Sequence, residues 1–524
     1  MTTTVGGPAR LRVIALLAAV LGLNTADSAT VGSIASELEP ALHISNPEIG
    51  LLVAVTTGIG AIATLPVGVL ADRVNRVRLL WISILVWSAG MIVNGLSVSF
   101  AMLLLSRLAL GAVVATAGPA TSSLTGDYFG RAERGRIWGY ILSGELLGTG
   151  IGFLVSGNLA SVATWRAGFI WLAAPGLVLA WAIRRHLPEP ARGGQSRLVP
   201  GETRIRPVRE LEGAAPGGGA EPPGEGDADA PREGDADAPR EGADAPWEGA
   251  DAQPEREPEP VVREVEREEI APDERLVLHE DPTGRPLWWA VRHVLSIPTN
   301  RALIIASALG YYFLQGLQTF AVLFLRSRFG LGQSAASTIL VVLGAGAIIG
   351  VLVAGQLGDR LIARGRISAR PVIGGVALLV AVALFLPALL ISSLVIAAPL
   401  FFVAAAGLGG SNSPLDAARL DIMHSRLWGR AEAVRTVLRT SLQAIAPLAF
   451  GYVSAAFGGR GASFAQTSSP RSTTALDRTF LIMLVPLVVA GVLLLVRARM
   501  TYPRDIATAA ASERATEPTR RVSG

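Results

Sequence analysis

Three ionisable residues stand within long apolar stretches of the N-terminal third of this sequence: Asp27, Arg107 and Glu145. A charge inside a membrane-spanning segment is costly, so such residues usually face a protein interior or a water-filled path and serve function. At about 1.5 Å per residue, Asp27 and Arg107 reach similar depths in a hydrocarbon core about 30 Å thick, which allows an ion pair. Protonation of Asp27 would weaken that pair and bias one conformation.

A permanent structural salt bridge is the alternative interpretation of this pair. Glu145 is a candidate for a second proton or substrate group, and it lies within residues 144–150, which read GELLGTG. Glycines at this spacing allow two helices to pack closely. We therefore expect Asp27, Arg107 and Glu145 to be the proton-coupling residues.

A short polar motif follows the second apolar stretch, where residues 68–78 read GVLADRVNRVR, and a degraded copy follows at 355–360 as GQLGDR. Arginines of the first copy are placed to reach Asp127, so this set would latch the two halves of the protein closed on the cytoplasmic side, and the second copy is expected to latch more weakly or not at all. A set of membrane anchors is the simpler alternative. The candidate gate residues are Gly68, Asp72, Arg73, Arg76, Asp127, Arg136, Asp359 and Arg360.

Twelve apolar runs are long enough, at roughly 20 residues, to cross a membrane. One motif at the same place in each half indicates an internal duplication of six helices. The runs lie near 11–33, 49–70, 78–97, 100–125, 136–159, 166–185, 301–325, 335–357, 371–391, 394–415, 432–456 and 478–497. The expected fold is therefore all-α, with two six-helix bundles.

Arginine is concentrated in alternate short connections, such as those after the second and fourth runs, whereas residues 35–48 contain none. Positive residues favour the cytoplasmic side, so this bias predicts a multi-pass protein of the cell membrane with both termini in the cytoplasm. The same placement explains the basic pI without nucleic acid. The chain has no Cys and five scattered His, and it shows no nucleotide-binding or hydrolase motif. We therefore expect neither an enzyme nor a bound cofactor or metal.

The division into domains follows the runs. Residues 1–185 form the first bundle and 297–500 the second. Residues 186–296 between them contain imperfect acidic repeats over 226–255 and are predicted to be a mostly disordered cytoplasmic linker. Within it, 287–295 (LWWAVRHVL) suits a short helix at the membrane interface. Residues 501–524 are expected to be a disordered tail.

Polar and aromatic side chains in the seventh run and nearby suit a cavity for a large amphipathic ligand. Ordinary helix packing is the alternative. The candidate cavity residues are Asn24, Tyr311, Tyr312, Gln315, Gln318 and Asn412.

The 68–78 motif, followed by RLALG at 107–111, resembles the major facilitator superfamily over about 380 residues. Asn24 with Asp27, Gly50-Leu51-Leu52, Trp87-Ser88 and residues 126–129 (GDYF) resemble its spinster-like branch, although Ser28 stands where that branch usually has Arg. The resemblance implies that Asp72 faces the start of the eleventh helix, near 429–432, where the helix dipole favours an anion.

Together these features predict a secondary transporter that works by alternating access, most simply a monomer that exports an amphipathic or lipid-like molecule in exchange for protons. Uptake or uniport of a metabolite is the alternative within the same fold. A membrane receptor or regulator that signals through the central loop is the alternative outside it.

Overall fold

The computed structural model describes residues 7–129, 134–190, 196–198, 206–207, 260–458 and 470–516. Side chains of some residues within helices also lie outside this description, among them Asp72, Arg73 and Arg136. The repeats at 226–255 lie outside the described residues too. In the described part, twelve helices are long and apolar enough to cross a membrane, as the sequence predicts.

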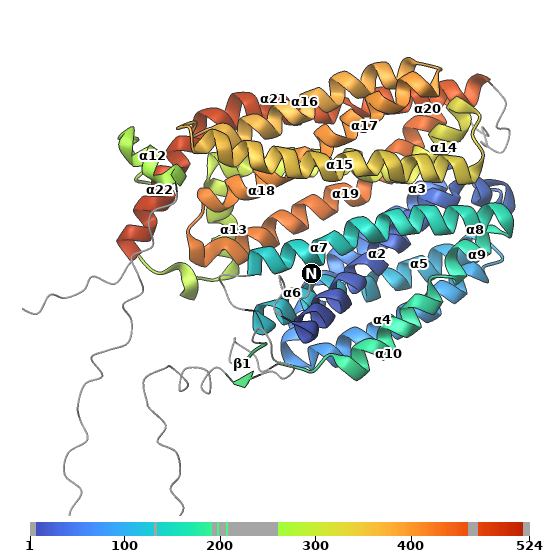
Figure 1. Ribbon diagram of the computed structural model, residues 1–524, viewed down its shortest axis with the longest axis horizontal. Helices are drawn as coiled ribbons and strands as arrows, with labels where there is room; N and C mark the ends of the chain where they lie inside the picture. Colours follow the sequence, from blue (N-terminus) through green and yellow to red (C-terminus); the bar gives the residue numbers. More distant parts are fainter. Residues whose placement is uncertain are drawn as a thin grey trace, which may run out of the picture.

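The first six spans form one half of the molecule, below the second half in Figure 1. In this half the fourth, fifth and sixth spans are each built from two or three consecutive helical segments. The elements are α2 (Pro8–Leu42), α3 (Asn46–Arg73), α4 (Arg76–Gly95), α5 (Phe100–Val114), α6 (Ala117–Tyr128), α7 (Arg134–Ile151), a π-helical turn (Gly152–Ser156), α8 (Gly157–Val162), α9 (Trp165–Ile170) and α10 (Ala173–His186).

Short segments connect the halves, and then the second six spans follow. The connecting elements are β1 (Ser196–Arg197), which pairs antiparallel with β2 (Arg206–Pro207), then α12 (Pro260–Arg267), a 3-10 turn (Pro282–Gly284) and α13 (Leu287–Ser296). The second half comprises α14 (Pro298–Phe329), α15 (Gln333–Ile362), α16 (Ala369–Leu390), α17 (Leu394–Gly410), α18 (Asn412–Asp421), a 3-10 turn (Ser425–Leu427), α19 (Trp428–Gly458), α20 (Pro470–Met483), α21 (Val485–Leu493), a π-helical turn (Leu494–Ala498) and α22 (Arg499–Thr516).

The fourth span of each half is interrupted at an equivalent place. In the first half α5 ends at Val114 and α6 begins at Ala117, just before Pro119. In the second half α17 ends at Gly410 and α18 begins at Asn412, just before Pro414. Proline lacks the N–H that would bond four residues back and its ring crowds that carbonyl, so each proline accounts for the break.

Within the first half, α2 and α7 pack at backbone contact. A Cβ at Gly144 would overlap the carbonyl oxygen of Ala18, and one at Gly148 would overlap that of Gly22. These glycines recur every four residues on the face of α7 that touches α2, which is the close packing that the sequence predicts around Glu145.

Contacts between the halves gather at the end of the bundle away from the termini, called here the far end. There Arg326 Nη1 on α14 donates to Glu37 Oε1 on α2 at 2.7 Å, and Asn46 Nδ2 on α3 donates to Ser454 Oγ on α19 at 2.8 Å. Ser36 Oγ donates to Gln333 Oε1 at 2.9 Å. The inter-half hydrogen bonds that the structure describes therefore close the far end.

Two expectations about the connecting segments are wrong. Residues 501–516 are not a disordered tail, because α22 continues the twelfth span and buries Tyr502 and Ile506. The linker is also ordered over a longer stretch than α13, since residues 260–286 are described and Val261 and Val265 on α12 are buried. Neither segment is apolar enough for its sequence alone to predict an ordered structure. The two segments are ordered because they pack against each other.

The packing of these two segments centres on α22. The backbone N–H of Asp273 donates to Thr508 Oγ1 at 2.8 Å, and that of Leu278 donates to Ser512 Oγ at 2.9 Å. The buried ring of His424, in the connection after α18, lies 2.8 Å from Thr516 Oγ1. The connection between the tenth and eleventh spans is thus joined to the C-terminal helix.

Replacing Gly148 by Ala is expected to destabilise the protein by about 1–3 kcal/mol, because the new methyl group must push α2 and α7 apart. Gly344→Ala is the matched control, since a Cβ there meets nothing within 4 Å. Denaturant or thermal unfolding of the purified protein in detergent measures the change in stability caused by each substitution. Equal effects of the two substitutions would contradict the packing argument.

Lowering the pH through about 6.5, the usual pKa of histidine, is expected to loosen α22. Burial lowers the pKa of His424, with Glu513 and Asp281 opposing that shift while Arg426 adds to it. His293 nearby also has a pKa lowered by burial. The unfolded state therefore binds the proton more readily than the folded one, so the contribution to stability is present above the unfolded pKa and is lost as pH falls below it. The expected result is lower protection of the amides over 500–516, relative to their intrinsic exchange rate at each pH, when the pH is lowered in the wild type. His424→Gln should show no such loss of protection.

Candidate functional site

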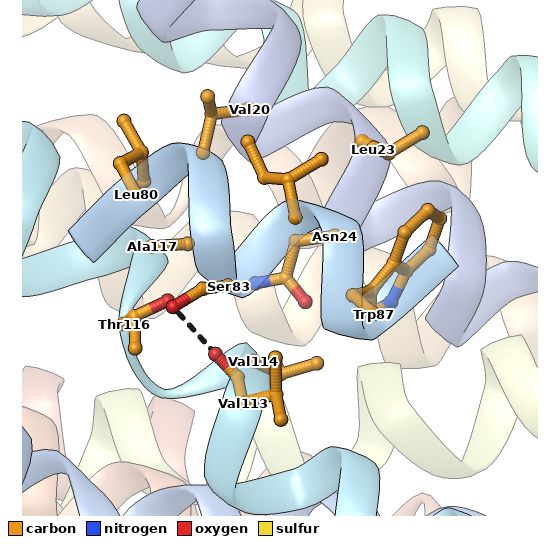
Figure 2. Close-up of a pocket in the computed structure, with 11 residues that line it drawn as sticks. Val20, Leu23, Asn24, Leu80, Ser83, Trp87, Val113, Val114, Thr116 and Ala117 are labelled. Carbon is orange, nitrogen blue, oxygen red and sulfur yellow. Dashed lines mark hydrogen bonds between the residues drawn. The ribbon is translucent and has the colours of Figure 1, made fainter. Parts of the chain in front are cut away.

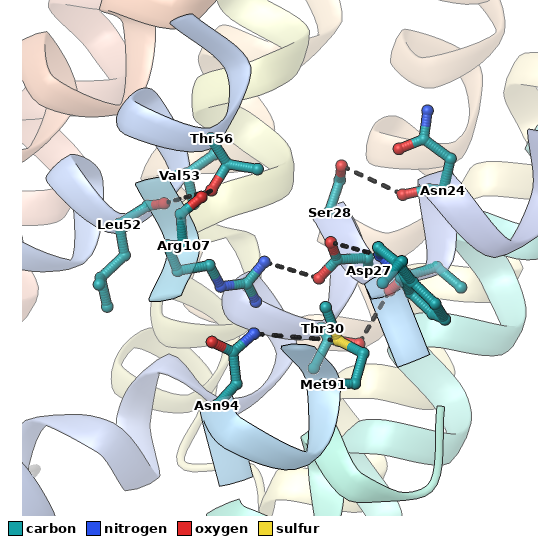
Figure 3. A network of polar contacts seen from close by, with 12 residues as sticks. Asn24, Asp27, Ser28, Thr30, Leu52, Val53, Thr56, Met91, Asn94 and Arg107 are labelled. Carbon is teal, nitrogen blue, oxygen red and sulfur yellow. Dashed lines mark hydrogen bonds and ion pairs between the residues drawn. The ribbon is translucent and has the colours of Figure 1, made fainter. Parts of the chain in front are cut away.

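Asp27 and Arg107 form an ion pair in the interior of the first half. Arg107 Nη1 lies 2.6 Å from Asp27 Oδ1, and each side chain is only 2% exposed. Trp87 Nε1 donates to the second carboxylate oxygen at 3.4 Å, and the guanidinium carbon lies 4.9 Å from the ring centroid of Phe169. Figure 3 shows the pair between α2 and α5. The pairing that the sequence predicts is present, and its role in proton transfer stays a prediction.

The pair is incompletely satisfied. Among the described residues, Arg107 Nε and Nη2 are buried without a hydrogen-bond partner. A buried donor without a partner costs free energy, so the guanidinium depends on its single carboxylate. Loss of the charge on Asp27 would therefore change the environment of Arg107 at once.

A narrow cleft of about 30 Å³ lies beside the pair, within the first half. Asn24, Ser83, Trp87, Val113 and Thr116 are among its lining residues. Figure 2 shows Asn24 and Trp87 directed into it from α2 and α4, next to the break between α5 and α6. Trp87 therefore touches both the cleft and the Asp27 carboxylate, and Asn24 lies on the cleft as expected for a cavity residue.

Glu145 lies half-buried on α7, held against α2 by the close helix contact and by Thr25 Oγ1, which donates to its backbone carbonyl at 2.8 Å. Its carboxyl group interacts electrostatically with Arg439 on α19 of the other half. The structure thus separates the three candidate proton residues: Asp27 and Arg107 pair inside one half, whereas Glu145 faces the other half.

Candidate cavity residues of α14 face α19. The guanidinium carbon of Arg439 lies 4.3 Å from the ring centroid of Tyr311, and Gln443 Nε2 donates to Gln315 Oε1 at 2.7 Å. Tyr312 turns away toward Met483, whose sulfur its hydroxyl contacts at 3.6 Å. Ordinary packing thus accounts for Tyr312.

The remaining cavity candidates occupy different surroundings. Gln318 is half-buried, and its backbone carbonyl lies so close to Gly32 on α2 that a Cβ there would overlap it. Asn412 is the half-buried first residue of α18, at the break in the tenth span. Their part in a cavity stays a prediction.

The gate candidates of the first half meet at the end of the bundle that carries the termini. Arg76, the first residue of α4, forms a buried ion pair with Asp127 near the end of α6. Its Nε also lies 2.8 Å from Glu189 Oε1, and its Nη2 donates to the carbonyl of Pro190 at 3.0 Å. Arg76 and Asp127 therefore pair as the sequence predicts, but both lie in the first half, so this contact does not latch the two halves together. Gly68, Asp72 and Arg73 lie on α3, and Arg136 lies on α7. Their contacts, including the side chains of the three charged residues, lie outside this description.

The second half repeats this arrangement with other residues than the motif suggests. Arg370, the second residue of α16, forms an ion pair with Asp421 at the end of α18, and Tyr502 donates to the same carboxylate. Asp359 is largely exposed and lies 3.6 Å from Arg370, and Arg360 is exposed. The degraded copy thus contributes one long contact to Arg370, which corresponds in position to Arg76, and its part in a gate stays a prediction.

Sequence reasoning missed Glu189, Tyr502 and the stacking of Arg439 on Tyr311. The 51-residue spacing of Arg76 from Asp127 recurs between Arg370 and Asp421, which is a signal that could have identified Arg370. Glu189 follows the sixth span and Tyr502 lies in the twelfth span beyond its apolar run, and neither carries a comparable signal.

These features define a membrane protein of two related six-helix halves, with a buried ion pair inside one half and half-buried charges between the two. The Major Facilitator Superfamily model matches residues 17–447, and the chain belongs to that family. The two expectations, the superfamily and the all-helical twelve-span fold, are confirmed.

The chain is similar to known transporters. It is 29% identical over 175 residues to a probable L-galactonate transporter of Escherichia coli (strain K12), covering 33% of this chain and 38% of that protein. It is 24% identical over 186 residues to the uncharacterized transporter YybO of Bacillus subtilis (strain 168), covering 36% and 43%. The chain thus matches less than half the length of these relatives.

Solved structures share the fold over nearly the whole chain. A bacterial homologue of the human lysosomal transporter Spinster, inward-facing and unoccupied, aligns with a TM-score of 0.68 at 19% identity, covering 95% of this chain and 98% of that one. The nucleoside transporter NupG aligns with a TM-score of 0.59 at 14% identity, covering 93% and 98%. At these identities the likeness concerns the fold. Together the family and its relatives support a membrane transporter and not an enzyme.

Breaking the Asp27–Arg107 pair from one side is expected to cost about 3–5 kcal/mol of stability, because a buried charge is left without its partner. Arg107→Gln therefore destabilises strongly, and the double variant with Asp27→Asn is less destabilised than the sum of the single variants. Denaturant unfolding of the four proteins forms a double-mutant cycle. Additive effects would show that the pair contributes no coupling energy.

Proposed function

We propose that the chain is a secondary active transporter that moves an amphipathic organic or lipid-like molecule out of the cell in exchange for protons. Its location is the cell membrane, with both termini in the cytoplasm. The observation that carries the proposal is the buried Asp27–Arg107 pair beside a mostly apolar cleft, because Trp87 joins this titratable group to the lining of a candidate substrate path.

Protonation of Asp27 would release Arg107 from its only carboxylate partner among the described residues. Trp87 would lose a hydrogen-bond acceptor at the same moment, and it lines the cleft. A proton on Asp27 thus changes the shape and charge of the cleft together, which is the differential interaction that coupling requires. One charge moved through 100 mV supplies about 2.3 kcal/mol.

The arrangement of the halves supports alternating access. Hydrogen bonds described between them close the far end, and a similar solved structure is inward-facing. If the termini are cytoplasmic, the terminus end is the one that opens to the cytoplasm. The paired arginine–aspartate contacts there lie within each half, so each half can move as a unit.

The experiment measures proton flux in proteoliposomes with a pH-sensitive dye, while gradients of candidate amphipathic compounds are imposed. Compound-dependent flux in the wild type is expected, with its loss in Asp27→Asn, because an amide cannot carry the proton. Glu274→Gln, an exposed carboxyl outside the spans, is the matched control and should behave as the wild type.

Compound movement without proton flux in either protein would indicate uniport and leave the pair a structural role. Proton flux in the same direction as the compound would contradict exchange. It would indicate uptake of the compound together with protons by the same fold.

A further inference from the structure

A group of charged side chains lies on the face of α18 and α19, and two carboxylates there hold two arginines. Arg435 Nη1 lies 2.9 Å from Asp416 Oδ1, and its Nη2 lies 2.7 Å from Glu432 Oε1. Arg419 Nη1 lies 2.6 Å from Glu432 Oε2. Both carboxylates are thus engaged, and both guanidinium groups are neutralised.

Arg439 lies one turn further along α19, about 13 Å beyond the start of that span at Arg430. Its guanidinium group stacks on the ring of Tyr311 at 4.3 Å. Among the residues that the structure describes, no carboxylate lies within ion-pair distance of Arg439, and its buried Nε has no hydrogen-bond partner. The group therefore holds three guanidinium charges against two carboxylates.

An arginine at this depth requires a counter-anion or water, because its charge is costly in hydrocarbon. A candidate on the protein is the half-buried Glu145, which interacts electrostatically with Arg439 from α7 of the other half. Among the described residues no ion pair joins the two groups, so the Arg439 guanidinium has a donor left for another anion. Tyr311 on α14 belongs to the same group, because its ring lies under the Arg439 guanidinium.

We propose that Arg439 binds the carboxylate group of the transported molecule and that Glu145 is the competing anion. The proposal rests on the transport function above and names the chemical class of its substrate. A guanidinium group offers a planar pair of donors that matches a carboxylate, and stacking on Tyr311 fixes its plane. The Gln315–Gln443 amide pair, one turn along both helices, is placed to contact a polar group further along the same molecule.

The competition sets a pH dependence. The charged and titratable groups around the site are Glu145 from α7, Tyr311 from α14, Asp416 from α18, and Arg435 with Arg439 from α19. Asp416 is already held by Arg435. When Glu145 takes up a proton, it no longer competes for Arg439. The affinity for a carboxylate ligand therefore rises as pH falls, until the carboxyl group of the ligand itself protonates. The anion and the proton on Glu145 then move in the same direction, so the proton that is exchanged in the proposed transport cycle is the one on Asp27.

The test measures equilibrium binding to the purified full chain in lipid nanodiscs. The unfolding midpoint is recorded against concentration for four probes with one carbon skeleton: hexanoate, hexanamide, hexylamine and hexyl phosphate. Hexanoate alone is expected to raise the midpoint of the wild type, and more at pH 5.5 than at pH 7.5. A larger effect of hexyl phosphate would correct the anion class to phosphate.

Three variants at the site separate binding from folding. Arg439→Gln is expected to weaken hexanoate binding at least tenfold, and Arg439→Lys less, because it keeps the charge and loses the planar pair of donors. Glu145→Gln should strengthen binding and remove its pH dependence. Arg184→Gln is the matched control, since Arg184 stacks on Trp81 at 5.2 Å but is exposed and far from this site.

Equal stabilisation by all four probes, unchanged hexanoate binding in Arg439→Gln, or no carboxylate binding from acetate to octanoate in wild type and Glu145→Gln would overturn the proposal. These results concern binding alone. Proton-coupled movement of a neutral or cationic compound would then leave the transport function standing while this site assignment fails.

Discussion

The cost of placing charge in a hydrocarbon environment governs where this chain can put its ionisable residues. Inside the first half, Asp27 and Arg107 meet at 2.6 Å and are almost completely buried. Such a pair contributes little net stability compared with apolar packing, since desolvation offsets most of the attraction. A fold could be held together more simply without it. Its retention beside a cleft is therefore better explained by function, and this reasoning supports the proton-site proposal.

The same constraint appears twice at the terminus end, where the duplication of the chain is clearest. Arg76 pairs with Asp127 and Arg370 with Asp421, each joining the start of a third span to the end of a fourth. Each fourth span is also broken before a proline. The partners then differ: Glu189 completes the first pair and Tyr502 the second. In the first half the added group is a second carboxylate on the arginine, whereas in the second half a hydroxyl of the C-terminal helix donates to the aspartate.

Much of this could be predicted from the sequence. Apolar runs gave the spans to within a few residues at most ends, because a bilayer demands uninterrupted apolar length. The Asp27–Arg107 pair followed from depth and opposite charge. Contacts between segments that are not apolar could not be predicted: α22 continues to Thr516 because Thr508 and Ser512 bond to the linker, and no local pattern records that partner.

The two candidate proton carboxylates differ in what a conformational change does to them. Asp27 and Arg107 both belong to the first half, so rocking of the halves leaves their 2.6 Å contact unchanged. Glu145 and Arg439 belong to different halves, and their interaction depends on how the halves sit. A proton on Asp27 must therefore act through the local shape of the cleft, at Trp87 and Asn24. A proton on Glu145 acts directly on the attraction between the halves, and so it is the more sensitive of the two to whether the site is occupied.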